Sequence, residues 1–220
     1  MAHSKVQFKT ISPFGPPIGM IKLPNECVDI LLKLTEETKN HNINQGPRLA
    51  GVLENELRIP LELLKESGMD TFFDNCFRQY VISSLSTHGI MNLSSGKLSE
   101  YDEGSIQTEL TEAWVNYQFE NEYNPLHYHT GCTLSSTLYL KIPKYESRNI
   151  PGKQNLDGNI VFVNGNVNTP STSLEAPLIN LEPEVGDMFI WPSRLLHEVY
   201  PFKGKGERRS VAINAIHSFL

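Results

Sequence analysis

The chain has 220 residues and a formal net charge of −6, with no basic stripe, so nucleic-acid binding has no electrostatic support. No apolar run approaches the ~20 residues of a membrane helix, and the first residues lack the apolar core of a signal peptide. Three cysteines without a C-x-x-C spacing are typical of reduced thiols. We therefore expect a soluble, cytoplasmic protein.

The first hundred residues are expected to be mainly helical. Residues 6–11 suggest a first strand, and the apolar spacing after Pro24 predicts a helix over residues 24–40. Residues 59–86 predict one longer helix or two shorter ones, interrupted at Gly68, which also resembles a helix stop.

From about residue 100 the pattern changes to short runs of β-branched and aromatic residues between Gly, Pro and Asn clusters. The predicted strands lie at residues 111–120, 133–142, 159–164, 176–183, 187–193, 197–202 and 208–216. Short strands with such turns are typical of a sandwich or jelly roll, and helices followed by strands fit an α+β fold. We expect a single domain over residues 1–220, with a helical support region at 1–100 packed on one sheet and a core at 101–220.

Two histidines, His127 and His129, stand two positions apart at the entrance of a predicted strand. Residues i and i+2 of a strand point to the same side, so both could face one metal ion, and the distant His197 could complete a triangle. A metal held at three corners keeps open positions for substrate and oxygen. The alternative is one histidine pointing inward and one outward because of a bulge.

The last predicted strand carries a candidate carboxylate anchor. Its residues alternate between two faces, with Arg208, Ser210, Ala212 and Asn214 on one and Arg209, Val211 and Ile213 on the other. An arginine followed by small polar residues on one face suits a pocket that binds a carboxylate. The alternative is that Arg208 is a surface residue beside Arg209.

Residues 114–216 resemble the 2-oxoglutarate and Fe(II)-dependent dioxygenases, and among them the small prolyl-hydroxylase-like oxygenases of bacteria and phages. The motifs that carry the resemblance are His127-Tyr-His129-Thr, Ser135-Ser136-Thr-Leu-Tyr139, Pro183-Glu-Val-Gly186-Asp187, Trp191-Pro192-Ser193 leading to His197-Glu-Val199-Tyr-Pro201, and Glu207-Arg208-Arg-Ser210 with Asn214. Residues 1–100 carry no such likeness. The resemblance implies a double-stranded β-helix, a cupin-like jelly-roll barrel with iron at one open end.

The resemblance also implies roles for individual residues. His127 and His197 match the family's first and distal metal ligands, and Arg208 matches the arginine that binds the far carboxylate of 2-oxoglutarate. Ser210 matches the serine that assists this arginine, and Asn214 belongs to the same motif. Tyrosines near the first ligand often contact the co-substrate, and the two candidates are Tyr117 and Tyr139.

His129 departs from the superfamily, most of whose members have Asp or Glu at this position. Three neutral imidazoles would form an all-histidine site. Alternatively, His129 is the first ligand and Gly131 takes the carboxylate position, as in the non-haem halogenases. The small group of oxygenases also has a histidine there, so we favour a metal site formed by His127, His129 and His197.

The resemblance implies an oxygenase that uses Fe(II), 2-oxoglutarate and O2 to hydroxylate a protein side chain, an amino acid or a small metabolite, releasing succinate and CO2. We expect no nucleic-acid or membrane partner, and the helical half could form a homodimer contact. One alternative is a cupin-like three-histidine metalloprotein, an isomerase or a dioxygenase that does not use 2-oxoglutarate and would not need Arg208. A second is a non-enzymatic jelly-roll binding module, which its metal content would distinguish.

Overall fold

A computed structural model describes residues 8–11, 15–87, 105–146, 151–164 and 178–219. Its helices are α1 (Asn25–His41), η1, a 3-10 turn (Gly46–Arg48), α2 (Leu61–Glu66) and α3 (Met69–Thr87). Its strands are β1 (Phe8–Ile11), β2 (Ile18–Lys22), β3 (Asn55–Arg58), β4 (Ile106–Gln118), β5 (Asn124–His127), β6 (Leu134–Lys141), β7 (Ile160–Val163), β8 (Leu178–Leu181), β9 (Asp187–Pro192), β10 (Leu196–Val199) and β11 (Arg208–Phe219).

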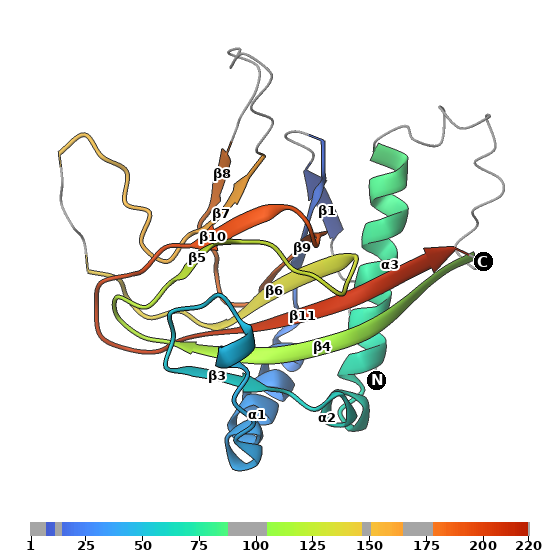
Figure 1. Cartoon of the computed structure of the whole chain (residues 1–220), viewed down its shortest axis with the longest axis horizontal. Helices are drawn as coiled ribbons and strands as arrows, with labels where there is room; N and C mark the ends of the chain where they lie inside the picture. Colours follow the sequence, from blue (N-terminus) through green and yellow to red (C-terminus); the bar gives the residue numbers. More distant parts are fainter. Residues whose placement is uncertain (1–7, 12–14, 88–104, 147–150, 165–177, 220) are drawn as a thin grey trace.

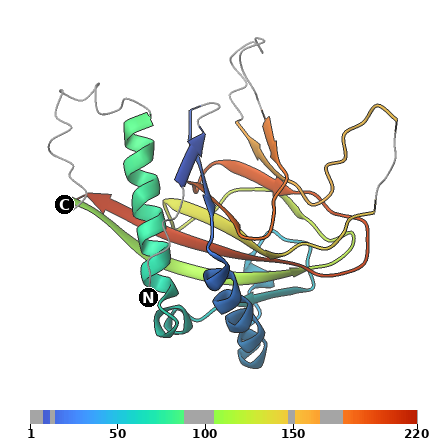
Figure 2. The same cartoon turned by 180° about the vertical axis from the view of Figure 1, so that it is seen from behind.

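The strands form two antiparallel sheets. The larger has the order β1-β2-β9-β6-β11-β4-β3, and the smaller has the order β5-β10-β7-β8. The helices pack on one face of the larger sheet, and the smaller sheet lies on its other side (Figures 1 and 2). This arrangement confirms the expected α+β fold with helices packed on one sheet of a jelly roll.

Alternating residues of the larger sheet separate two apolar cores. On β9, Ile190 packs toward the helices, whereas Phe189 and Trp191 pack toward the smaller sheet. The helix-side core also contains Phe73 and Phe77 of α3, both fully buried. Because successive side chains of a strand point to opposite faces, one strand serves both layers.

The predicted helices are present at nearly the expected positions. Pro24 precedes α1, and Asn42 closes it in the left-handed conformation, with φ 46°. Gly68 has φ 74°, a conformation that glycine adopts without strain, and it separates α2 from α3 as predicted. Of the helices in the described segments, none combines the length and the apolarity that crossing a bilayer requires.

The first half also contributes strands that the sequence pattern did not predict. β2 joins β1 to β9, and β3 forms the far edge of the larger sheet beside β4. Both are short, β2 (IGMIK) contains a glycine, and β3 carries two exposed polar residues, so neither has a clear strand pattern. Residues 6–7 and 176–177 of two predicted strands lie outside the described residues.

The long pair of β4 and β11 forms the floor on which the site is built. Their register runs from Arg208 opposite Gln118 to Phe219 opposite Ile106, with a shift after Asn214. On its other side β11 pairs with β6, where Ser210 lies opposite Tyr139. Side chains from three strands therefore meet on the face toward the smaller sheet.

Candidate metal centre and carboxylate pocket

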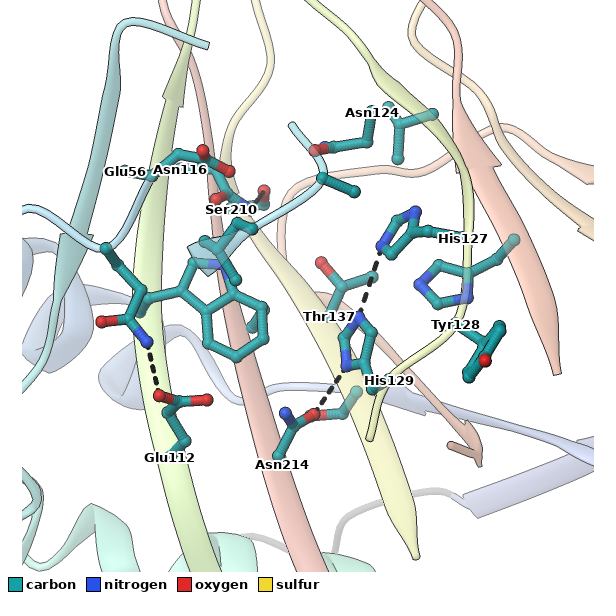
Figure 3. A pocket seen from close by; sticks show the side chains of 18 of the residues that line it. Glu56, Glu112, Asn116, Asn124, His127, Tyr128, His129, Thr137, Ser210 and Asn214 are labelled. Atoms are coloured by element: carbon teal, nitrogen blue, oxygen red, sulfur yellow. Dashed lines mark hydrogen bonds between the residues drawn. The ribbon is translucent and has the colours of Figure 1, made fainter. Parts of the chain in front are cut away.

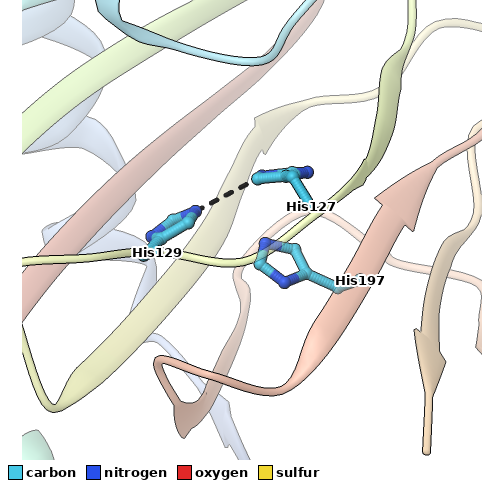
Figure 4. A group of neighbouring side chains, drawn as sticks. All are labelled: His127, His129 and His197. Carbon is cyan, nitrogen blue, oxygen red and sulfur yellow. Dashed lines mark hydrogen bonds between the residues drawn. The ribbon is translucent and has the colours of Figure 1, made fainter. Parts of the chain in front are cut away.

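The three candidate metal ligands converge at one end of the smaller sheet. His127 on β5 lies directly opposite His197 on β10 in the antiparallel register. His129 lies two residues beyond β5, and its backbone N–H donates to the carbonyl of Ser193 at 2.9 Å. One nitrogen of each imidazole lies within 4.8 Å of the others (Figure 4). Strand register thus positions two histidines, and the loop after β5, held by its hydrogen bond to Ser193, positions the third.

Each imidazole directs its Nδ1 to an oxygen that can only accept a hydrogen bond. The pairs are His127 with the carbonyl of Pro125 at 2.7 Å, His197 with the carbonyl of Leu195 at 2.9 Å, and His129 with the side-chain oxygen of Asn214 at 2.8 Å. In a neutral imidazole this places the proton on Nδ1 and leaves a lone pair on Nε2. Outer contacts of this kind orient histidines that bind metals.

The free Nε2 atoms are arranged for a cation. Nε2 of His127 and Nε2 of His129 are 3.3 Å apart, and with both protons on Nδ1 two lone pairs face each other. Burial lowers the pKa of all three histidines, that of His129 to about 4 and that of His197 well below its ordinary value. Since a neutral imidazole is the form that binds metals, the three residues fit a divalent ion.

An aromatic wall shields the buried side of this cluster. His197 is 3% exposed, and its ring centroid lies 4.8 Å from that of Trp191 and 6.1 Å from that of Phe162. Such packing excludes water from one side of the site and holds the His197 ring in place.

The histidines open into a cavity of about 250 Å³ (Figure 3). Its floor consists of alternate residues of neighbouring strands: Glu112, Trp114 and Asn116 of β4, Arg208, Ser210, Ala212 and Asn214 of β11, and Thr137 of β6. A loop that includes η1 contributes the rim through Gln45, Arg48, Leu49 and Ala50. The cavity therefore joins the metal ligands to the predicted carboxylate anchor.

Arg208 is a buried cation with unused hydrogen-bond donors. Its side chain is fully enclosed, and Nη1 donates to the side-chain oxygen of Gln118. Its Nε and Nη2 have no hydrogen-bond partner among the described residues. Buried donors are rarely left unpaired, and a guanidinium matches a carboxylate with two parallel N–H groups. The site therefore fits an anionic ligand such as the far carboxylate of 2-oxoglutarate.

Tyr139 borders the same position. The guanidinium of Arg208 lies 4.8 Å from the centre of its ring, and among the described residues its hydroxyl has no partner with hydrogen-bond geometry. Burial raises the pKa of Tyr139 to about 12, so the hydroxyl stays protonated and can donate to an acceptor. Ser210, opposite Tyr139 in the sheet, completes a polar wall around Arg208.

Arg209 faces the other way, as the alternation along the strand predicts. It lies on the helix side of the sheet, in ion pairs with Glu36 at 2.6 Å and Glu207 at 2.5 Å. Its Nη1 also donates to the hydroxyl of Thr35 on α1. Arg209 therefore ties α1 to the sheet, and Arg208 alone of the two faces the cavity.

The expected contact of Tyr117 with the co-substrate is wrong. Tyr117 lies opposite Arg209 in the register, its ring packs against that guanidinium at 4.8 Å, and its hydroxyl donates to the carbonyl of Thr35. These contacts place the side chain among the helices, away from the cavity. The reason is the alternation of side chains along β4, because its even-numbered residues face the cavity at this point and Tyr117 faces the helices.

Asn214 and Ser210 have more specific positions than the sequence indicated. Asn214 lies behind His129 as its hydrogen-bond partner, and Ser135 approaches the same imidazole nitrogen at 2.9 Å. Ser210 accepts a hydrogen bond from the amide of Asn116 at 3.4 Å. Asn214 therefore contacts the metal side of the cavity, and Ser210 the Arg208 side.

Several polar residues of the site were not predicted from the sequence, among them Glu56 and Asn116, which line the cavity, and Gln118, which accepts a hydrogen bond from Arg208. No motif marks them, and Glu56 lies on a strand that was itself missed. The polar residues Asn116 and Gln118 alternate with apolar ones in β4. That alternation could have indicated the face, but only after the register with β11 was known.

Residues 112–214 match the model of a family described as "Putative 2OG-Fe(II) oxygenase". The matched segment contains the three histidines and Arg208. The match confirms the resemblance seen in the sequence to the 2-oxoglutarate/Fe(II)-dependent oxygenases, a class that uses Fe(II), 2-oxoglutarate and O2. No curated protein sequence matches the chain.

One solved structure supports the fold, and two others are similar with lower TM-scores. A prolyl-4-hydroxylase from Pseudomonas putida is 14% identical over 96% of this chain and 93% of its own, with a TM-score of 0.51. A viral collagen prolyl hydroxylase from Paramecium Bursaria Chlorella virus-1 is 13% identical over 94% of both chains, with a TM-score of 0.42. A 2OG-Fe(II) oxygenase family oxidoreductase from Burkholderia pseudomallei is 12% identical over 60% of this chain, with a TM-score of 0.39, and this chain spans 57% of its length. The first likeness confirms the expected double-stranded β-helix.

Proposed function

We propose that this protein hydroxylates an organic substrate in a reaction that consumes O2 and 2-oxoglutarate and releases succinate and CO2. The observation that carries the proposal is the buried guanidinium of Arg208, with two unused nitrogens, in the same cavity as three convergent histidines. A metal site alone suits many reactions. A metal site joined to an arginine fork suits a co-substrate that is both a keto acid and a carboxylate.

His127, His129 and His197 would hold the metal through their Nε2 atoms. When bound, Fe(II) supplies the oxygen chemistry by which 2-oxoglutarate is decarboxylated and a C–H bond of the substrate is oxidised. The three Nδ1 contacts fix the imidazole tautomers in advance, so that no reorientation is needed when the metal arrives.

Arg208, Tyr139 and Ser210 would bind the far carboxylate of 2-oxoglutarate. The two unpartnered guanidinium nitrogens can donate in parallel, and the Tyr139 hydroxyl adds a third donor. With one end held there, the keto-acid end of the molecule can reach toward the histidines across the shared cavity. Trp191 and Phe162 limit the access of water behind His197.

The substrate class remains a peptide side chain, a free amino acid or a small metabolite. The fold is shared with a prolyl-4-hydroxylase, which favours a peptide or amino-acid substrate over a nucleic acid. A second candidate function is a three-histidine metalloenzyme that does not use 2-oxoglutarate. It does not explain why two nitrogens of the buried Arg208 are unpaired among the described residues.

A turnover assay tests the proposal. The purified chain is incubated with Fe(II), ascorbate and 2-oxoglutarate, with and without a library of peptides and amino acids, and succinate is measured. We expect iron-dependent succinate formation that a substrate increases and that Arg208→Ala reduces at least tenfold. Succinate formation that is equal with and without iron, or equal in the variant, would contradict the proposed function.

A further inference from the structure

A second group of unpartnered polar atoms lies in the cavity, apart from Arg208. Glu56 of β3 is 2% exposed and lines the cavity, and no residue in the described segments hydrogen-bonds to its Oε2. Asn116 of β4 lies directly opposite Glu56 in the register, and its Oδ1 is also buried and without a partner in the part of the chain that the structure describes. Figure 3 shows both side chains together beside Ser210, with the histidines on the other side of the cavity.

No cation compensates this carboxylate among the residues that the structure describes. The nearby Arg48 pairs with Glu112 at 3.3 Å, and Arg208 bonds to Gln118. Burial, and secondarily the charge of Glu122, raises the pKa of Glu56 to about 7. A buried carboxylate without a partner is costly, and in a native site its partner is often a ligand.

The adjoining loop is shaped around the carboxylate. A side-chain carbon at Gly51 would lie 2.5 Å from Oε1 of Glu56 and 2.6 Å from Oδ1 of Asn124. A side-chain carbon at Gly46 would lie 3.4 Å from Oε2 of Glu56. The two glycines thus let the backbone pass close to Glu56 without filling the space in front of it.

We propose that Glu56 and Asn116 bind a positively charged nitrogen group of the substrate, an ammonium or a guanidinium. The inference rests on the proposed function, and it names the substrate class of the same site. When Glu56 is ionised, both free atoms are acceptors, so their complement is a group that only donates, and a cation also offsets the buried charge. A second carboxylate would be repelled, which separates this subsite from the 2-oxoglutarate subsite at Arg208.

The proposed subsite also implies how the substrate is oriented in the cavity. A cation held at Glu56 on one wall places a neighbouring carbon of the same molecule in the cavity that the histidines share. The substrate would therefore be a basic amino acid, a basic side chain of a peptide or a small amine, oxidised at a carbon near its charged end.

Matched probes test this inference. The cationic probes are N-acetyl-lysine amide and N-acetyl-arginine amide, and their neutral counterparts are N-acetyl-norleucine amide and N-acetyl-citrulline amide. Binding is measured by NMR at pH 8, without oxygen, in the presence of Fe(II) and both with and without 2-oxoglutarate. We expect the wild type to prefer at least one cationic probe by tenfold or more over its neutral counterpart.

Three variants test which residues cause the preference for a cationic probe. Glu56→Gln should abolish the preference, Asn116→Ala should reduce it several-fold, and Glu54→Gln, an exposed carboxylate two residues away, should leave it unchanged. Thermal unfolding and Fe(II) binding of each variant show whether the fold and the metal site are retained.

An equal affinity of the wild type for cationic and neutral probes would overturn the inference, as would a preference that persists in Glu56→Gln. Failure of the proposed oxygenase function would be seen in a different measurement, because the binding of 2-oxoglutarate to the wild type is measured separately. A cation preference without any 2-oxoglutarate binding would support the subsite and reject the oxygenase.

Discussion

His127 and His197 are direct cross-strand partners in the β5–β10 pair, so strand register sets their separation before any ion binds. Their ring centroids lie 4.2 Å apart, and each Nδ1 is held by a backbone carbonyl. A site built on paired strands is more rigid than one built on loops. The metal site is therefore preorganised at two of its three corners.

Replacing His197 by Ala should remove metal binding at some cost in stability. His197 is buried against Trp191 and Phe162, so its truncation leaves a cavity, and we expect a loss of about 1–3 kcal/mol of unfolding free energy. Bound iron per chain and urea unfolding measure the two effects. His217→Ala, a histidine away from the cluster that contacts Thr133, is the control and should retain iron. Full iron binding by His197→Ala would exclude it as a ligand.

His129 provides a test of the all-histidine site. His129→Asp would create the two-histidine, one-carboxylate set of metal ligands. The carboxylate reaches less far than an imidazole, but we expect the variant to retain detectable iron binding, with an altered rate of turnover. His129→Ala should lose much more affinity. Iron titration of both variants compares them with the wild type. Equally tight binding by His129→Ala and the wild type would show that His129 is not a ligand.

Asn214 should act on the metal through His129. Asn214→Ala removes the acceptor that orients the His129 imidazole, and losses of this kind typically weaken metal binding about 10–100-fold. A competition titration with a metal chelator measures the change. Asn214→Asp, which keeps an acceptor, should recover part of the affinity. Unchanged affinity in the Ala variant would mean that Ser135 alone orients the ring.

Arg208 should contribute to 2-oxoglutarate binding, whereas Arg209 should contribute to the stability of the fold. Arg208→Lys should weaken 2-oxoglutarate binding about tenfold or more, because a point charge cannot reproduce the two parallel donors. Arg209→Lys should leave that affinity unchanged but lower stability, because its partners are Glu36 and Glu207 on the helix side. Calorimetric titration of 2-oxoglutarate into the metal-loaded variants separates the two. A reversed pattern would require the opposite strand face to line the cavity.

The ion pair of Glu36 predicts a specific response to acid. Hydrogen bonds from Lys39 first and Arg209 second lower the pKa of Glu36 to about 2 from its ordinary 4.5. A lowered folded-state pKa contributes stability that is fully present above pH 4.5 and is lost as the pH falls through 2. Glu36 is half-exposed, so solvent screening limits its contribution to less than ~1 kcal/mol.

Glu36→Gln should therefore make unfolding free energy fall less steeply between pH 4.5 and 2. Urea unfolding at a series of pH values measures the slope, and Glu37→Gln on the same helix is the matched control. An identical slope in wild type and Glu36→Gln would show that the pair contributes nothing to acid stability.

The sequence predicted the parts of the site that depend on local periodicity. Alternation along one strand correctly separated Arg208 from Arg209, and Gly68 correctly marked a helix break. Tyr117 was misplaced because its face depends on how β4 aligns with β11, about ninety residues away in the chain. Strand register across such distances is set by tertiary packing and is not written in either strand alone.

Glu56 shows a different limit. It lies on a four-residue edge strand with little apolar character, and nothing near it in sequence marks a site. Its position matters because β3 pairs with β4, which places the carboxylate opposite Asn116 in the cavity. The cavity residues among the first hundred positions could therefore be identified only from the fold.

Calorimetric titration of 2-oxoglutarate into the oxygen-free protein, with and without Fe(II), tests the central claim most directly. We expect one molecule to bind per chain, at least tenfold more tightly with iron than without, and this metal-dependent gain should disappear in His127→Ala. Binding that is equally tight without iron and in His127→Ala, or no binding at all to the iron-loaded protein, would contradict an oxygenase site formed by His127, His129, His197 and Arg208.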